Sequence, residues 1–170
     1  MSGFEVKVAF TSSKVNAAKI PQAIARGLNE GGDLVRTRVQ RALKVQTNVK
    51  SYRSITSRVR TVRAFAGSLH YDIVATGKGI PIEEFPVAVT SKGVDAKTWG
   101  VDHLFKRSFA EGGSGVLRAR LGRSRFPIRK LYGPSLPKEL GRGEIPGVFA
   151  AATAQLVPPT IVKHLVRALG

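Results

Sequence analysis

The residues of this chain best suited to acid–base chemistry are three histidines and a few carboxylates. His70 and Asp72 lie two positions apart, so they would share one face of a strand, where a carboxylate can orient an imidazole base. No Gly-x-Ser-x-Gly elbow or comparable nucleophile accompanies them. We therefore interpret His70 and Asp72 as surface or packing residues.

The remaining candidates give no support to metal, nucleotide or paired-carboxylate chemistry. The histidines at 70, 103 and 164 are scattered without metal-ligand spacing. Glu83 and Glu84 are adjacent, so their side chains diverge if the segment is extended, which argues against a paired-carboxylate hydrolase. The glycine clusters at 77–79 and 111–115 lack the Gly-x-x-x-x-Gly-Lys-Ser/Thr pattern of a phosphate-binding loop. We predict that the protein is not an enzyme and needs no metal or cofactor.

Positive charge is the strongest compositional signal. Lys and Arg number 28 against 11 Asp and Glu, a formal net charge of +17, which favours phosphate polyanions or an acidic protein as partner. Nine basic residues lie between Arg36 and Arg63, and no acidic residue lies between Asp33 and Asp72. We predict a face that touches DNA phosphates or an acidic neighbouring subunit, formed by Arg36, Arg38, Arg41, Lys44, Lys50 and Arg53. A solvated basic helix without a dedicated partner is the alternative.

Length and composition predict one domain over 1–170 with a hydrophobic core. Hydrophobic residues make up 42% of the chain, which is typical of a globular protein, and the absence of cysteine excludes disulfides and thiolate metal sites. We found no apolar run approaching the roughly 20 residues of a membrane span, and no signal-peptide pattern at the N-terminus. We therefore expect a soluble protein without a membrane partner.

Hydrophobic periodicity predicts an α+β fold. Alternating residues at 4–10 indicate an N-terminal strand, and helical spacing follows from about residue 20, with Gly31-Gly32 expected to separate two helical pieces. Hairpins are predicted for 59–65 with 69–75 and for 87–90 with 94–99. The segments 104–109 and 116–121 flank a long flexible connection at 111–115, which is expected to become ordered on assembly. Extended loops are expected at about 76–86 and 110–116. An alanine-rich helix should stop at Pro158-Pro159, where a last helix begins.

A proline-rich strap, 125–140, precedes the C-terminal helices. Its prolines fix φ and remove backbone donors, so the segment cannot continue a helix or a central strand and should run extended with turns. One interpretation is a simple connection between a sheet and a helix. The other is a docking segment, because apolar side chains at 126, 128, 131, 132 and 136 alternate with basic ones.

The strap also resembles a known signature. Phe-Pro-Ile-Arg-Lys-Leu-Tyr-Gly-Pro-Ser-Leu-Pro, residues 126–137, is similar to the "LPIR-LYGPS-P" motif near the end of the prophage minor tail protein Z family, a tail-completion group of long-tailed phages. Weaker similarities lie at 35–43, 79–85 and 90–94, while the first strand and the last twenty-five residues carry none.

The resemblance implies a structural virion protein at the head-proximal end of a phage tail, made in the host cytoplasm. Such a protein completes the tail and helps it join the head, as a ring of six copies between tail and connector. It implies partners among tail and neck proteins, namely the tail terminator and the head–tail connector, with nonspecific contact to genomic DNA. We place the subunit interface at Phe126, Pro127, Ile128, Arg129, Leu131, Tyr132, Gly133 and Pro134.

A basic nucleic-acid-binding module of ribosomal or nucleoid type is the alternative function. The sequence pI of about 11.2 and the basic run support it. Aromatic residues make up only 7% of the chain, and no RNA-binding aromatic strand pair is present. Such a module would therefore have to bind by backbone charge alone.

Overall fold

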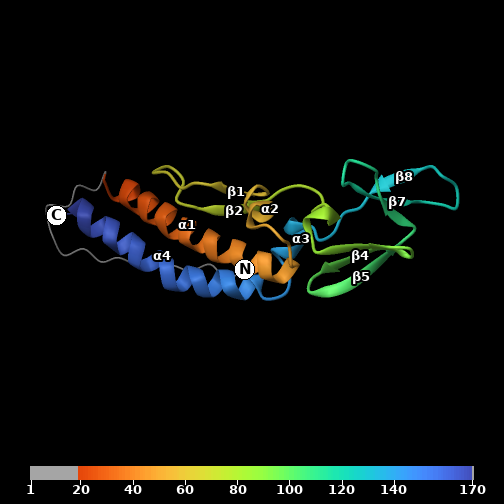
Figure 1. The fold of residues 1–170 in the computed structure, drawn as a ribbon. Helices are drawn as coiled ribbons and strands as arrows, with labels where there is room; N and C mark the ends of the chain where they lie inside the picture. Colours follow the sequence, from red (N-terminus) through yellow and green to blue (C-terminus); the bar gives the residue numbers. More distant parts are fainter. Residues whose placement is uncertain (1–18, 170) are drawn as a thin grey trace. The chain divides into compact units, whose positions relative to one another are not determined.

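The computed structural model describes residues 19–169, which form the α+β fold expected from the sequence (Figure 1). The predicted strand at 4–10 lies outside the described residues. The elements, in order, are α1 Ile20–Thr47, α2 Tyr52–Thr56, β1 Val59–Val62, β2 Asp72–Ala75, a 3-10 turn η2 Ile82–Glu84, β3 Val87–Thr90, β4 Gly93–Thr98, β5 Val101–Lys106, β6 Ser108–Ala110, β7 Leu117–Arg120, β8 Ile128–Lys130, α3 Leu136–Glu139 and α4 Ile145–Leu169. The strands form three sheets, ordered β1-β2, β3-β4-β5 and β6-β7-β8.

The chain divides into two compact units, each assembled from distant parts of the sequence. Of the described residues, unit 1 takes in 19–39, 61–74 and 146–169, and unit 2 takes in 40–60 and 75–145. We describe each unit by itself. That 1–170 behaves as one domain stays a prediction.

In unit 1, glycines let α1 pack closely against α4. We expected Gly31-Gly32 to divide this region, but α1 runs unbroken through both residues. A Cβ added at Gly27 would lie 2.5 Å from the Cα of Ile161, and one at Gly31 would lie 3.0 Å from the Cα of Val157. The prediction of two pieces was wrong because these glycines, four positions apart on one helix face, serve close helix packing.

Residues 61–74 of the β1–β2 hairpin belong to unit 1 and are held against α1 at residues 29–33. A Cβ at Gly32 would lie 2.5 Å from the Tyr71 ring, and the Tyr71 hydroxyl donates to Asp33 Oδ1 at 2.7 Å. Burial and this bond raise the pKa of Tyr71 to about 12. The Asn29 side chain bonds both the N–H and the C=O of Ala64, each at 2.9 Å, so it acts as a strand partner for the hairpin.

Helix α4 continues through Pro158 and Pro159, where we expected one helix to stop and another to begin. The Thr160 hydroxyl lies 2.8 Å from the carbonyl of Val157 and 2.9 Å from that of Gly27 on α1. Packing on α1 therefore holds together a helix that local propensity would break.

The length of α4 also corrects the expectation that no apolar stretch of this chain approaches the length of a membrane span. Because the two prolines do not divide it, two shorter apolar stretches become one helix of 25 residues. Among residues 19–169, α4 is the one helix long and apolar enough to cross a membrane, a test that the core helix of a soluble protein also passes.

In unit 2, the predicted hairpin of 87–90 with 94–99 forms as β3 and β4, whereas the segment 104–109, expected as one strand, is divided at Arg107 between β5 and β6 of two different sheets. Strands β3 and β4 pair antiparallel with Val89 opposite Val94, and β6 and β7 pair with Phe109 opposite Arg118. Ser108 links the two sheets, because its hydroxyl accepts from the Val94 N–H at 2.7 Å and donates to the Phe105 carbonyl. The expected loop at 110–116 is the tight connection between β6 and β7, closed by Glu111 and Val116.

The strap contributes an edge strand to one sheet of unit 2, and its following residues hydrogen-bond to residues 80–82 of the core. Residues 128–130 form β8 at the edge of its sheet, where a proline-flanked strand is tolerated. Beyond β8, Ile80 N–H donates to Pro134 O at 2.8 Å, Gly133 N–H to Ile80 O at 2.7 Å and Ile82 N–H to Leu131 O at 3.2 Å. The segment 76–86, expected as a loop, thus becomes core, and Ile80, Ile82 and Phe85 are fully buried.

An ion pair secures the same segment from its other side. Arg58 donates to Glu84 at 2.7 and 3.2 Å and to the Ser54 carbonyl at 2.7 Å. Burial alone would raise the pKa of Glu84, but hydrogen bonds from Arg58 and Ser54 outweigh it and hold the pKa below its ordinary value of 4.5. The charged form of Glu84 therefore stabilises the fold.

We expect Gly27→Ala to destabilise the protein, although alanine is the better helix former. The overpacking against Ile161 should outweigh the helix-propensity gain and lower the free energy of unfolding by roughly 1–2 kcal/mol, measured by urea denaturation. Gly147→Ala in α4 is the matched control, because an added Cβ meets nothing within 4 Å there. Equal or increased stability of Gly27→Ala would contradict the close helix contact.

We expect Glu84→Gln to reduce stability at pH 7 by roughly 1–3 kcal/mol, because it leaves Arg58 without its charged partner. A lowered folded-state pKa gives stability that is present above about pH 4.5 and is lost as pH falls through that lowered value. Wild-type protein should therefore lose more stability than Glu84→Gln between pH 5 and 3, in urea melts at each pH. Asp102→Asn, at an exposed position on β5, is the control and should keep the wild-type slope.

Candidate partner-binding site

The acid–base candidates of the sequence lie together on the β1–β2 hairpin but form an open arrangement. Ser68 Oγ lies 2.7 Å from His70 Nδ1, and His70 Nε2 lies 3.7 Å from Asp72 Oδ2. His70 and Asp72 are exposed, and a catalytic histidine normally has a buried carboxylate at hydrogen-bond distance to orient it. Among residues 19–169, no three His, Cys, Asp or Glu side chains could hold a metal ion.

The predicted basic face is partly neutralised. Arg36 lies 3.4 Å from Asp33, one turn earlier on α1, and Arg38 donates to Gln155 at 2.6 Å. Arg58 and Arg63, later in the same run, pair with Glu84 and Asp33. Arg41, Lys50 and Arg53 are exposed and Lys44 is half-buried, and these four belong to unit 2. That they touch DNA or an acidic partner stays a prediction.

The strap divides into a buried half and an exposed half. Leu131 and Pro134 are buried inside their own unit, and a Cβ at Gly133 would lie 3.0 Å from the Phe85 ring. These three residues anchor the strap and are not free to meet a neighbour. Ile128 is half-buried, whereas Phe126 is 63% exposed, and Pro127, Arg129 and Tyr132 are also exposed. The residues of the predicted interface that remain available to a neighbouring subunit are therefore Phe126, Pro127, Arg129 and Tyr132, together with the half-buried Ile128.

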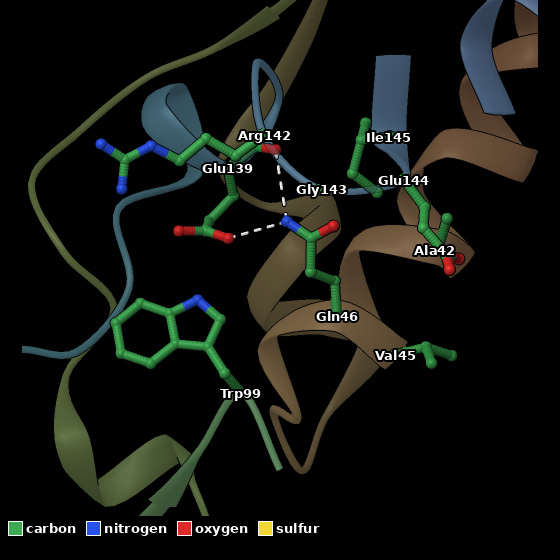
Figure 2. Close-up of a pocket in the computed structure, with 9 residues that line it drawn as sticks. All are labelled: Ala42, Val45, Gln46, Trp99, Glu139, Arg142, Gly143, Glu144 and Ile145. Atoms are coloured by element: carbon green, nitrogen blue, oxygen red, sulfur yellow. Dashed lines mark hydrogen bonds between the residues drawn. The ribbon is translucent and has the colours of Figure 1, made fainter. Parts of the chain in front are cut away.

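Unit 2 also contains a cavity of about 620 Å³ that the sequence did not reveal (Figure 2). It lies between the last turns of α1, the β4–β5 turn and the connection from α3 to α4. Its apolar lining comes from Ala42, Val45, Trp99 and Ile145, and its polar lining from Gln46, Glu139, Arg142 and Glu144.

Hydrogen bonds fix the walls of this cavity. Gln46 Nε2 donates to the backbone carbonyl of Glu139 at 3.4 Å and to its carboxylate at 2.8 Å, as Figure 2 shows. Gly143 has φ +60°, and a Cβ there would lie 2.5 Å from Gln46 Oε1. The Thr47 carbonyl, at the end of α1, accepts from the Trp99 N–H at 3.2 Å. The pocket is thus preformed.

Trp99, the single tryptophan of the chain, is held in an unusual conformation at the mouth of the cavity. It occupies a two-residue β4–β5 turn with φ 51°, followed by Gly100 with φ 74°, the pattern of a type I′ turn that favours Asn-Gly. A bulky side chain in the left-handed region is strained. Trp99 is 46% exposed and Val45 81% exposed, so the chain keeps a strained turn that presents an aromatic surface.

This geometry suits recognition of an apolar or aromatic side chain flanked by positive charge. The apolar lining would bury such a side chain, and the two carboxylates, Glu139 and Glu144, against the one cation, Arg142, leave the lining with a net negative charge that favours a cation beside it. The one signal in the sequence for this turn is Trp99 followed by Gly100 between two alternating segments. The sequence pattern places Trp99 at the end of a strand and does not predict its role in a cavity.

Comparison of the chain with protein-family models, with curated proteins and with solved structures finds no match.

We expect Trp99→Asn to leave the protein folded, with stability unchanged or raised by up to about 1 kcal/mol, because asparagine relieves the strained turn. Urea denaturation of both proteins measures the difference. A loss of more than about 1 kcal/mol would show that Trp99 serves packing rather than recognition.

Proposed function

We propose that this chain is a structural virion protein that completes the head-proximal end of a long-tailed phage tail and helps it join the head as a ring of six copies. The similarity of residues 126–137 to the minor tail protein Z signature supports this function. The observation that carries it is the division of that segment into a buried anchor and an exposed docking half.

The exposed half has a complementary surface on the same chain. The loop between β7 and β8 extends away from its sheet (Figure 1). Phe126 lies at the β8 end of this loop, beside the bond from the Leu121 N–H to the Pro127 carbonyl at 3.1 Å that closes it. The Arg125 guanidinium lies 5.6 Å from the Phe126 ring centroid. We propose that this loop of one copy enters the Trp99 cavity of the next, with Arg125 and Arg129 near Glu139 and Glu144. A contact between two different patches is heterologous, and such contacts close into rings when the rotation allows.

The energetics favour assembly on a template. Burying one Phe side chain contributes only about 1.5–3 kcal/mol, whereas association costs an estimated 4–15 kcal/mol in translational and rotational freedom. Isolated copies should therefore associate weakly, and a tail end that holds several copies would raise their effective concentration. Tail and neck proteins, the terminator and the connector among them, are the partners that this account requires.

We expect deletion of the gene from the genome that encodes it to yield heads and tails that fail to join, as seen by electron microscopy. Adding the wild-type protein to those tails should restore joining. Normally joined particles after deletion would contradict the proposed function.

We expect Phe126→Ala to reduce restored joining at least tenfold, because each interface loses about 1.5–3 kcal/mol of apolar burial. Phe65→Ala is the matched control, since Phe65 is also 63% exposed but lies in unit 1. Thermal melts should show both variants folded. Equal activity of the two variants would refute the Phe126 contact.

A further inference from the structure

A second cavity in unit 2, of about 400 Å³, gathers positive charge without any acidic residue in its lining. It lies among the β3–β4 turn, the start of β6, the end of β7 and the turn that follows. Four cationic side chains line it, namely Lys92, Arg107, Arg120 and Arg123. Lys92, Arg107, Arg120 and Arg123 are all exposed, so the cavity is open to a polymer.

The four cations of this cavity have no acidic partner in the part of the chain that the structure describes, whereas two other cations of the β6-β7-β8 sheet do. Arg118, on the same strand, pairs with Glu111 at 2.9 Å, and Lys130 on β8 pairs with Glu83 at 2.9 Å. None of the ion pairs among residues 19–169 involves the four cations of the cavity. The Arg120 N–H donates to the Arg107 carbonyl at 3.0 Å, which makes these arginines cross-strand neighbours. Neighbouring like charges destabilise a sheet, so an anion bound between Arg107 and Arg120 would relieve their repulsion.

The backbone around the cavity is rigidly held. Arg107 sits in the left-handed region with φ 59°. Gly93 has φ +137°, and a Cβ there would lie 2.2 Å from the Phe105 carbonyl oxygen. The Ser108 bonds described above fix the same corner, and the Arg120 guanidinium lies 5.2 Å from the Phe109 ring centroid. These contacts fix the backbone from which Arg107 extends and the position of the Arg120 side chain.

We propose that this cavity binds the phosphodiester backbone of a nucleic acid, without reading its sequence. Three of the four cations are arginines, whose planar forks match phosphate oxygens. The one aromatic ring in the lining, Phe109, carries Arg120 over it, which disfavours base stacking there. The inference stands on these residues alone and does not depend on the proposed function.

The test measures binding of the full chain to a fluorescent 20-base-pair DNA duplex by anisotropy over a salt series. Arg107→Gln/Arg120→Gln should weaken binding at least tenfold and reduce the slope of log K against log salt by about 2, since each phosphate contact contributes about 0.9. Arg123→Gln, in the loop after β7, should reduce the slope by about 1. Because this residue is exposed and outside the strands, the single variant still tests the proposal if the double variant does not fold.

Lys78→Gln/Lys138→Gln removes the same number of charges from exposed positions elsewhere in unit 2, outside both cavities, and should bind like wild type. If both double variants lose affinity equally, overall charge and not the cavity drives binding, and the proposal fails. Inorganic phosphate should compete with DNA for wild type only at far higher concentration than unlabelled duplex; equal potency per phosphate would mean a free-phosphate site. A polyglutamate peptide that binds the cavity more tightly than DNA of equal charge would overturn the nucleic-acid assignment in favour of an acidic protein.

Discussion

Unit 2 depends on the backbone hydrogen bonds that join residues 80–82 to residues 131–134 of the strap. They connect segments fifty residues apart, and they place Ile80, Ile82 and Phe85 in the core. Because the strap is held from one side, its Phe126 end is free to face outward. The Arg58–Glu84 pair secures the same segment from the other side. One set of contacts thus both closes the core and positions the surface through which we propose that copies meet.

The fold could be predicted from the sequence where local pattern and tertiary contact agree. The hairpins are such a case, because alternation predicts strands and glycine-containing turns join them. The helices show the opposite. Gly31-Gly32 and Pro158-Pro159 predict breaks by local propensity, yet both helices continue because of tertiary contacts. Gly31 lets α4 approach, Gly32 leaves room for the Tyr71 ring, and next to the prolines the Thr160 hydroxyl donates to the Gly27 carbonyl of α1. Propensity carries no information about which helix will pack opposite, so this outcome could not be read from either segment alone.

The candidate site was predictable to a smaller extent. The strap stood out by its proline pattern and its resemblance, but which side chains are buried depended on residues 80–85, and that pairing leaves no local signal. The basic run looked continuous because Asp33 lies just outside it and Glu84 far beyond it, and both neutralise members of the run. The cationic cavity could not be predicted, because Arg107 lies far in sequence from Arg120 and Arg123 and the pairing of β6 with β7 is what brings them into one lining.

Together the proposals describe a basic protein whose β7–β8 loop docks in the Trp99 cavity of a neighbouring copy and whose cationic cavity binds DNA, a combination that would suit a ring around passing DNA. The contact between the Phe126 loop and the Trp99 cavity is its central claim, and the absence of cysteine makes that claim open to cross-linking. Ser124→Cys and Val45→Cys proteins, both of which keep Phe126, are mixed on tails under oxidising conditions. Ser124 is an exposed residue of the same loop, so the mixture should give a covalent dimer that neither protein forms alone. No mixed dimer, or dimers of each variant by itself, would contradict the account.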